Sequence, residues 1–308
     1  MKIGPEFELN RGKAEYKGGN FTEAINSFEK AIQLGVKSQD CCPELEDSYY
    51  KLARIFCKDA SWKPAKKHIA KALQRNPGSL LYQRLSSILD KNINSSHDRS
   101  QLQGNLEHVK QIGSLIELEN FNKKLYSPLI SETYCVCAYR SGYDEESGNP
   151  LSRAIRRMKK EGSEELSPHL GRLMVAYLLS GTPLADFIDL IIPVPADPLR
   201  RKERGYHIVE DMSVPFENFL ALPVFTNIIE KVKETPSLRG YNKYDREKIL
   251  SGSFRIVEST LLRNRNILII DEVLTHGTTI REVAKTIRNS NPKGIYALVF
   301  GKTERSKS

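Results

Sequence analysis

Apolar residues recur every three or four positions from residue 8 to about residue 125, whereas from about Tyr134 they gather in short continuous runs. The first spacing places apolar side chains on one face of a helix, and the second is typical of buried parallel strands. A chain of 308 residues can form two domains, each with its own core. We therefore expect a helical domain over residues 8–125 and an α/β domain over residues 126–308.

The second domain alternates apolar strands with amphipathic helices. This order predicts an open, mainly parallel sheet, and such sheets bind their ligands at the carboxyl ends of the strands. The expected strands are Tyr134–Tyr139, Phe187–Ile192, Asn266–Ile270 and Ile295–Phe300, and the expected helices are Leu151–Lys160, Leu170–Leu179 and Glu282–Arg288.

Two segments of the helical domain share one order of small and aromatic residues, with Ala24 and Ala65 in equivalent positions. This order resembles the tetratricopeptide repeat, which has a period of about 34 residues, and Pro77 falls where that repeat ends with proline. The resemblance implies stacked helix pairs that bind a peptide or protein partner. The alternative is an ordinary bundle of helical hairpins. A third, degenerate unit could begin near Leu81, although residues 91–104 are too polar for the pattern, and helices from about Leu106 would cap the stack or dock it on the next domain.

The composition fits a protein of the cytoplasm. No apolar run approaches the roughly 20 residues that span a bilayer, and the amino terminus lacks the pattern of a signal peptide. The five cysteines contain no C-x-x-C pair, which argues against a structural zinc site. The formal charge of +9 is compatible with phosphate-rich ligands or nucleic acid, and also with a merely soluble surface.

The apolar run Ile267–Ile270 is followed by two acids, Asp271 and Glu272, and then by a turn that opens into a helix. The N–H groups of such a turn form a binding site for phosphate. Gly277 permits close approach of a ligand to the backbone, and two carboxylates suit the hydroxyls of a ribose. Alternatively, the acids only cap the helix and the threonines stabilise the turn. The turn residues are Thr275, His276, Gly277, Thr278 and Thr279.

This segment resembles the phosphoribosyl pyrophosphate signature of type I phosphoribosyltransferases. The resemblance implies such a fold from about Tyr134 to Thr303, with the ribose diol on Asp271 and Glu272 and the 5′-phosphate on Thr275–Thr279. It also implies Mg²⁺, which would contact the same two acids and bridge diphosphate and ribose oxygens. His276 departs from the commoner threonine or serine, a change that leaves the backbone donors in place.

A second segment narrows the resemblance to the competence-associated ComF-type branch. Asp189–Pro195 ends in a Val-Pro turn, and the basic stretch after it ends in Arg204-Gly205-Tyr206. In related transferases the N–H groups of this turn face the pyrophosphate, and nearby arginines add positive charge. Alternatively, the arginines belong to a solvated helix start. The implied pyrophosphate-binding residues are Val194, Pro195, Ala196, Asp197, Arg200 and Arg204, with Arg201 as a further candidate.

A third segment, from Thr235 to Phe254, also matches the ComF-type pattern without gaps. In transferases this stretch is a flexible hood over the pyrophosphate. The resemblance therefore implies a catalytic role for Arg246 or Lys243, which could reach the leaving group. Leu238 and Ile249 replace a glutamine and an asparagine of the family pattern, and Asp245 replaces a glutamate. These departures bear on closure of the hood rather than on phosphate binding.

Together the resemblances imply transfer of a phosphoribosyl group from phosphoribosyl pyrophosphate to a nitrogen nucleophile, with release of pyrophosphate. Most of the catalysis would be electrostatic and positional. His207 and His276 are general-base candidates by residue type alone. The alternative is a non-catalytic ComF-like adaptor in DNA uptake or nucleic-acid handling, which would bind single-stranded DNA and dock a partner through its repeats.

Overall fold

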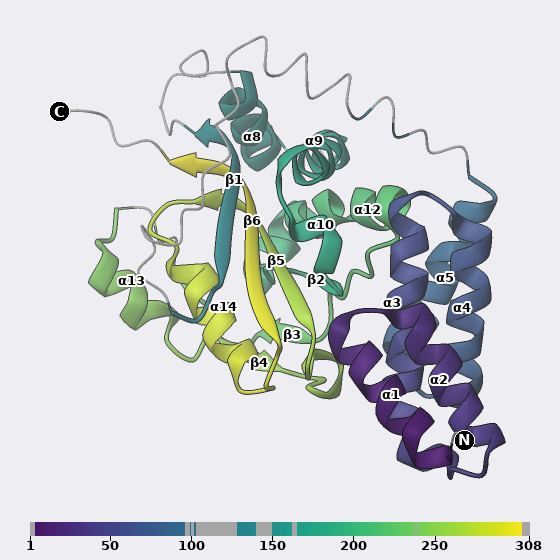
Figure 1. Ribbon diagram of the computed structural model, residues 1–308. Coiled ribbons are helices and arrows are strands. Elements are labelled where there is room, and N and C mark those ends of the chain that lie inside the picture. Colours follow the sequence, from purple (N-terminus) through teal and green to yellow (C-terminus); the bar gives the residue numbers. More distant parts are fainter. Residues whose placement is uncertain are drawn as a thin grey trace. The chain divides into compact units, whose positions relative to one another are not determined.

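The computed structural model describes residues 4–95, 99, 102, 128–139, 150–161, 165–236, 238 and 240–303. Contacts divide the chain into two compact units, Met1–His97 and Asp98–Ser308 (Figure 1). The domain boundary expected at residues 125–126 lies outside the described residues, as do the helices expected from about Leu106.

All regular elements described in the amino-terminal unit are helices. They are α1 (Pro5–Gly18), α2 (Phe21–Gln33), the 3-10 turn η1 (Ser38–Asp40), α3 (Cys42–Lys58), α4 (Trp62–Arg75) and α5 (Leu80–Ile93). α1 packs on α2 and α3 packs on α4, and Ala24 of α2 and Ala65 of α4 are fully buried. A Cβ atom on Gly12 would lie 2.6 Å from the Phe28 ring. The expected helical region is confirmed, with small residues at its crossings.

Two contacts join successive helix pairs of this unit. The Tyr16 hydroxyl donates to Asp47 Oδ2 across 2.7 Å and links α1 to α3. The ring centroids of Tyr50 and Tyr82 lie 5.6 Å apart and link α3 to α5. α5 begins where the sequence allowed a third unit. The assignment to tetratricopeptide repeats stays a prediction.

The carboxy-terminal unit is built on a four-stranded sheet in which every neighbouring pair is parallel. Its strands are β1 (Glu132–Tyr139), β2 (Leu190–Pro193), β5 (Asn266–Leu274) and β6 (Gly294–Thr303), in the order β1-β6-β5-β2. Residues Ile267–Ile270 of β5 are fully buried, as expected for a strand that is covered on both faces. The expected α/β region with a mainly parallel sheet is confirmed.

Helices cover both faces of this sheet (Figure 1). Outside the segment 229–256, the described α-helices of this unit are α8 (Pro150–Glu161), α9 (Leu166–Gly181), α10 (Leu184–Phe187), α11 (Pro198–Arg204), α12 (Ile208–Leu220) and α14 (Thr278–Arg288). α14 joins β5 to β6 on one face, while α8, α9 and α12 share a core with Leu268, Ile270 and Leu298 on the other. α9 and α12 cross closely, because a Cβ atom on Gly171 would lie only 2.2 Å from the Met212 carbonyl oxygen.

A smaller, two-stranded antiparallel sheet lies outside the main sheet. It consists of β3 (Ile229–Lys231) and β4 (Phe254–Ile256), and α13 (Lys243–Leu250) lies between them in the chain. α13 packs on α14, at the outer edge of the unit in Figure 1. We call the described residues from 229 to 256 the hood.

All four strands of the sheet differ from their expected bounds. β1 begins at Glu132 rather than Tyr134, and β6 runs from Gly294 to Thr303 rather than from Ile295 to Phe300. The differences in β2 and β5 bear on the site. β2 begins at Leu190 rather than at Phe187, because Phe187 is the last residue of α10. β5 continues to Leu274, so that Asp271 and Glu272 lie inside the strand, with Asp271 opposite Val299 of β6. Backbone pairing with β6 extends the strand past its apolar run, and the side-chain pattern cannot show this.

The part of the chain that the structure describes holds no helix that is both long enough and apolar enough to cross a membrane.

Candidate functional site

Two of the segments singled out in the sequence meet where β2 and β5 end. The strands are neighbours, and Pro193 pairs with Ile270 in the parallel register. The Val194 N–H donates to the Ile270 carbonyl across 2.9 Å, so the stretch from Val194 to Asp197 leaves the sheet beside Asp271. The residues expected to bind ribose and those expected to bind pyrophosphate therefore share one edge of the sheet.

Asp271 and Glu272 differ in their electrostatic surroundings. Burial, and then repulsion from Glu272, raise the pKa of Asp271 well above its usual range. Its Oδ1 accepts from the Glu272 backbone N–H across 2.8 Å. Glu272 pairs with Lys159 of α8, with 3.0 Å between Oε1 and Nζ. Burial would raise the pKa of Glu272, but Lys159 lowers it to about 2. Of the two acids, Asp271 therefore holds a proton to higher pH, whereas Glu272 ionises readily beside Lys159.

The two acids suit hydroxyl groups. A protonated carboxyl both donates and accepts hydrogen bonds, and a carboxylate accepts them, so Asp271 and Glu272 can hold two neighbouring hydroxyls. Among the described residues, no group of three or more His, Cys, Asp or Glu side chains is placed to hold a metal ion. Mg²⁺ often binds through one or two carboxylates and the phosphates of a substrate. Glu272, the acid with the lowered pKa, could contact a Mg²⁺ ion that arrives with a phosphorylated ligand, and Asp271 could do so once it is ionised.

α14 begins at Thr278 with no side-chain cap, directly after the turn. Gly277 has a φ of 69°, in the left-handed region that favours glycine. The first N–H groups of a helix lack acceptors within the helix. Thr278 is 6% exposed, and its Oγ1 has no hydrogen-bond partner among the described residues. A buried hydroxyl of this kind is costly, and a phosphate oxygen at the helix start could accept from it.

Arg246 of α13 reaches the same turn. Its Nη1 donates to Thr275 Oγ1 across 2.9 Å, and its Nε donates to the Tyr241 carbonyl across 2.7 Å. Burial lowers the pKa of Arg246, although a guanidinium stays charged in proteins. Lys243, the other catalytic candidate, is exposed at the first residue of α13. The structure thus brings Arg246 to the turn expected to bind the 5′-phosphate.

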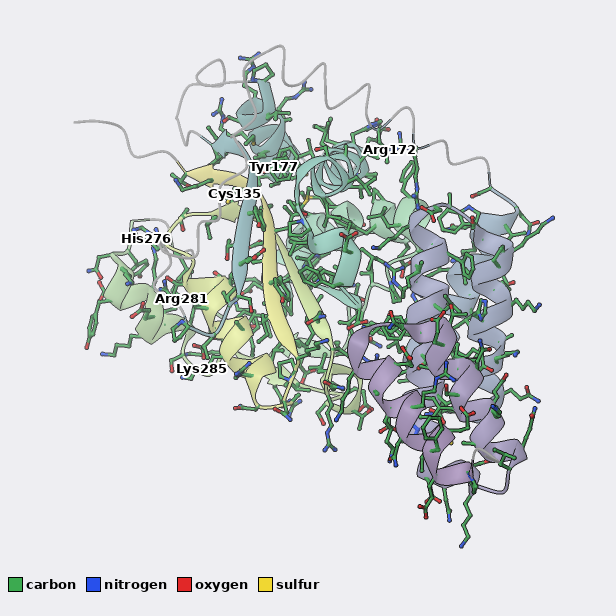
Figure 2. All side chains as sticks on the ribbon, viewed as in Figure 1. Cys135, Arg172, Tyr177, His276, Arg281 and Lys285 are labelled. Atoms are coloured by element: carbon green, nitrogen blue, oxygen red, sulfur yellow. The ribbon has the colours of Figure 1, made fainter. Side chains whose placement is uncertain are left out.

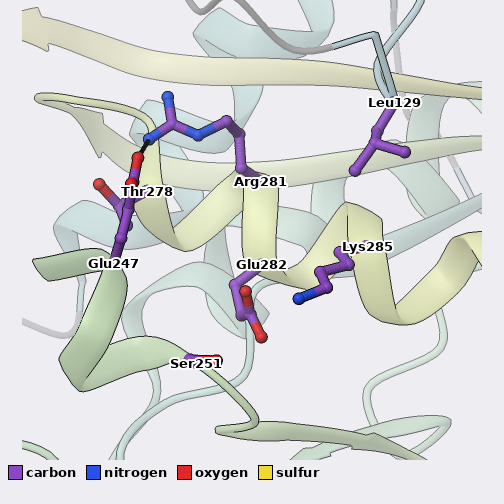
Figure 3. A pocket seen from close by; sticks show the side chains of 7 residues that line it. All are labelled: Leu129, Glu247, Ser251, Thr278, Arg281, Glu282 and Lys285. Carbon is purple, nitrogen blue, oxygen red and sulfur yellow. Dashed lines mark hydrogen bonds and ion pairs between the residues drawn. The ribbon is translucent and has the colours of Figure 1, made fainter. Parts of the chain in front are cut away.

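A second arginine joins α13 to this turn. Arg281 Nη1 donates to the His276 carbonyl across 3.1 Å, and Nη2 donates to Glu247 Oε1 across 2.7 Å. Figure 2 labels Arg281 and His276, and Figure 3 shows the contact with Glu247. These groups border a pocket of about 290 Å³. The residues that line it are Leu129, Glu247, Ser251, Thr278, Arg281, Glu282 and Lys285.

Asp197 connects the turn after β2 to the hood. Its Oδ2 accepts from Lys231 Nζ across 2.7 Å and from the Thr235 N–H across 3.2 Å, and its Oδ1 accepts from the Leu199 N–H across 3.2 Å. The Asp197 and Lys231 side chains are only 4% and 9% exposed. Burial would raise the pKa of Asp197, but Lys231 and these donors lower it. The carboxylate is committed to protein contacts, which leaves the backbone of Asp197 for the expected pyrophosphate contact.

His207 begins α12 as its cap. Its Nδ1 accepts from the Glu210 N–H across 2.9 Å, and burial lowers the pKa of the imidazole. Beside it, the Tyr206 hydroxyl donates to the Met158 carbonyl of α8 across 2.6 Å. These contacts give His207 a structural role at the start of α12. The described contact of His276 in the site is made by its backbone carbonyl, with Arg281.

The remaining pyrophosphate candidates are only partly described. The side chains of Arg200 and Arg204 lie outside the described residues, while Val194 is buried and Pro195 and Ala196 are half-buried. Arg201 pairs with Glu210 across 3.4 Å at an exposed position.

Sequence reasoning assigned no role to three cations of the site, Lys159, Lys231 and Arg281. Each pairs with an acid of a segment that is distant in the chain, Glu272, Asp197 and Glu247 respectively. Lys159 lies in a basic run of residues 156–160, but nothing in that run indicates Glu272 as its partner. Tertiary packing alone makes these pairs.

The fold and the site define an α/β domain that gathers acids, threonines and arginines at the carboxyl edge of a parallel sheet. No family model matches the chain. The carboxy-terminal part is homologous to ComF and YhgH proteins. It is 30% identical over 142 residues to "Competence protein F" of Haemophilus influenzae, an alignment that covers 45% of this chain and 62% of that protein.

Two further relatives share the name "DNA utilization protein YhgH". Identity is 25% over 143 residues with the protein of Salmonella typhi and 24% over 140 residues with that of Escherichia coli. Each alignment covers 45% of this chain and 61% of the relative. The chain therefore spans less than two thirds of the curated relatives that it matches.

Proposed function

We propose that the carboxy-terminal unit binds a ribose 5-phosphate group where β2 and β5 end, and that the protein acts in the uptake or use of DNA. One observation supports this ligand most directly. The pair Asp271–Glu272 lies shortly before a helix start that has no side-chain cap, and the Thr278 hydroxyl at that start is buried without a described partner. The names of the relatives, a competence protein and a DNA utilization protein, support the proposed role in the uptake or use of DNA.

Each part of the ligand has a counterpart in the site. Asp271 and Glu272 can each hydrogen-bond one of two neighbouring sugar hydroxyls, Glu272 as an acceptor and Asp271 as a donor when it carries a proton. The first N–H groups of α14 and the Thr278 hydroxyl can bind the phosphate oxygens. Arg246, already bonded to Thr275, can add a charge-assisted hydrogen bond. Phosphate and sugar are thereby recognised by separate groups of residues.

Calorimetric titration with three ligands tests this assignment. Ribose 5-phosphate should bind, while ribose should bind far more weakly because it lacks the charged group. 2-Deoxyribose 5-phosphate should bind roughly 10- to 150-fold more weakly than ribose 5-phosphate, since one hydrogen bond to a charged acid is lost. Equal affinity for the two sugar phosphates would contradict the assignment of Asp271 and Glu272 to the diol. If neither sugar phosphate bound, the proposed sugar-phosphate site would be wrong.

Phosphoribosyl transfer is the second candidate function. It is favoured by the turn after β2, which lies beside Asp271 and is tied to the hood through Asp197 and Lys231. A nitrogen nucleophile would form a bond to C1 of the sugar as the bond from C1 to the pyrophosphate oxygen breaks, with its electron pair leaving on pyrophosphate. Mg²⁺ would neutralise part of the charge on that leaving group. Asp271 and Glu272 would hold the sugar in place, and the backbone from Val194 to Asp197 would face the pyrophosphate.

Two measurements distinguish transfer from binding alone. The first is titration with phosphoribosyl pyrophosphate, with and without Mg²⁺. The second is release of pyrophosphate in the presence of a panel of nitrogenous bases. Release of pyrophosphate with one base would establish transfer. Binding of ribose 5-phosphate without release of pyrophosphate in the presence of any base would indicate a protein that binds the ligand but does not transfer it.

A further inference from the structure

One ring nitrogen of His207 is buried without a described partner. Nδ1 of this residue accepts from the Glu210 N–H across 2.9 Å and thereby caps α12. Nε2 has no hydrogen-bond partner among the described residues, and the residue as a whole is only 6% exposed. A buried polar group without a partner is costly. The missing partner at Nε2 is one that a bound ligand can supply.

The cap also determines which nitrogen of His207 carries the proton. Burial lowers the pKa of the imidazole below its usual 6.5, so the neutral ring predominates at neutral pH. A neutral imidazole has one N–H and one acceptor nitrogen. Because Nδ1 accepts from the Glu210 N–H, the proton lies on Nε2. His207 is thus a hydrogen-bond donor at Nε2 rather than the general base that its residue type suggested.

His207 lies beside the acid pair of the candidate site. Tyr206, the preceding residue, donates to the Met158 carbonyl of α8 across 2.6 Å. The next residue of α8, Lys159, pairs with Glu272 across 3.0 Å. Burial lowers the pKa of His207 and Glu272 opposes this effect, while burial would raise the pKa of Glu272 and His207 joins Lys159 in lowering it. The Nε2–H of His207 and the Glu272 carboxylate thus belong to one site.

We propose that His207 is a sugar-recognition residue whose Nε2–H donates to a ribose hydroxyl held by Glu272. A hydroxyl donates one hydrogen bond and can accept others, whereas a carboxylate only accepts. The same hydroxyl can therefore donate to Glu272 and accept from His207. A sugar without that hydroxyl would leave the Nε2–H buried and unpaired, so the site should select against it. This inference rests on the proposed function, because it adds a residue to the same sugar-phosphate site.

Two substitutions separate the cap from the proposed contact with the sugar. His207→Asn keeps an acceptor near the position of Nδ1 and places no group at the position of Nε2. His207→Gln can place an amide N–H near the position of Nε2 but is a poor cap. By hydrogen exchange, the first amides of α12 should keep their protection in His207→Asn and lose it roughly 2- to 30-fold in His207→Gln. By calorimetry, ribose 5-phosphate should bind His207→Asn roughly 2- to 10-fold more weakly and His207→Gln with nearly unchanged affinity.

Sugars that lack one hydroxyl show whether His207 contacts the diol. The probes are 2-deoxyribose 5-phosphate and 3-deoxyribose 5-phosphate, each compared with ribose 5-phosphate. For one of the two, the preference for ribose 5-phosphate should shrink roughly 2- to 10-fold in His207→Asn, because the contact and the hydroxyl are lost together only once. For the other sugar the preference should stay unchanged. His207→Gln should retain both preferences.

The outcomes distinguish this inference from the proposed function. If His207→Asn kept both preferences in full, the role of His207 would be overturned and the sugar-phosphate site would stand. If ribose 5-phosphate did not bind the unmodified protein, the proposed ligand would be overturned and this inference with it. Nitrogen NMR shifts of the His207 ring test the donor without any ligand. A proton on Nε2 supports the inference, and a proton on Nδ1 would overturn it.

Discussion

Arg246 of the hood donates a hydrogen bond of 2.9 Å to the Thr275 hydroxyl, directly before the start of α14. Arg281 reinforces the connection by bridging Glu247 of α13 and the His276 carbonyl of the turn. The position of α13 therefore depends on the same turn that we propose as the phosphate site. Binding of a phosphate there should change the surroundings of α13.

The first prediction concerns Arg246 itself. Arg246→Gln should weaken ribose 5-phosphate binding roughly 10- to 150-fold, because one hydrogen bond to a charged group is lost. Lys243→Gln removes the same charge from an exposed position of the same helix and should have a much smaller effect. Calorimetric titration of both variants checks this. Equal losses would mean that only general charge attracts the ligand.

The second prediction compares two threonines of α14. Thr278→Val removes a hydroxyl that has no described partner, so it should not destabilise α14 but should weaken phosphate binding roughly 10- to 150-fold. Thr286→Val removes a hydroxyl that donates to the Glu282 carbonyl across 2.9 Å and should cost about 1 kcal/mol of stability without changing affinity. Hydrogen exchange of α14 amides and calorimetry measure the two effects. A stability loss in Thr278→Val instead would show that its hydroxyl has a structural partner.

The third prediction is a pH dependence set by Asp271. Its folded pKa lies well above the ordinary value of 3.8, so the folded state keeps a proton that the unfolded state has released. Stability should therefore fall as pH rises from 3.8 toward the raised pKa, by up to about 1.4 kcal/mol per pH unit.

Asp271→Asn has no titratable group at this position and should lack that slope. Its stability relative to the unmodified protein should therefore increase with pH. Urea titrations at a series of pH values, followed by hydrogen exchange of peptides from β5, measure the difference. A difference that stays constant with pH would contradict a raised pKa for Asp271.

The fourth prediction concerns the tie between Asp197 and Lys231. Asp197→Ala leaves Lys231 buried without its carboxylate and should destabilise the hood by about 3–5 kcal/mol. Combining Asp197→Asn with Lys231→Met removes both charges and should recover part of that loss. Hydrogen exchange of β3 and β4 reports the local effect. If Asp197→Ala were no less stable than the double variant, an unpaired Lys231 charge would cost little at this position.

The same tie has a pH dependence of opposite sign. Because the folded pKa of Asp197 is lowered below 3.8, the stability that it contributes is present above that pH and is lost as the pH falls through the lowered value. Acidification should therefore lower the protection of β3 and β4 amides, relative to the intrinsic exchange rate at each pH, more in the unmodified protein than in the Asp197→Asn, Lys231→Met variant.

The sequence by itself determined the two kinds of architecture and the position of the candidate site residues after the buried strand Ile267–Ile270. Periodicity is a local property, so the helical half and the buried strands could be predicted from it, as could the order of strand, acid pair, turn and helix from Ile267 to Thr279. The tetratricopeptide assignment, the ligand and the partner remain predictions, because they came from resemblance rather than from a local physical rule.

Only the tertiary structure decided which side chains hold the site together. Lys159 with Glu272, Lys231 with Asp197, and Arg246 with Thr275 join residues that are far apart in the chain. It also extended β5 through Asp271 and Glu272, because a strand ends where its neighbour stops pairing with it rather than where its apolar residues stop. Burial and charge at such contacts depend on the packing of several elements at once, and no local pattern in the sequence records them.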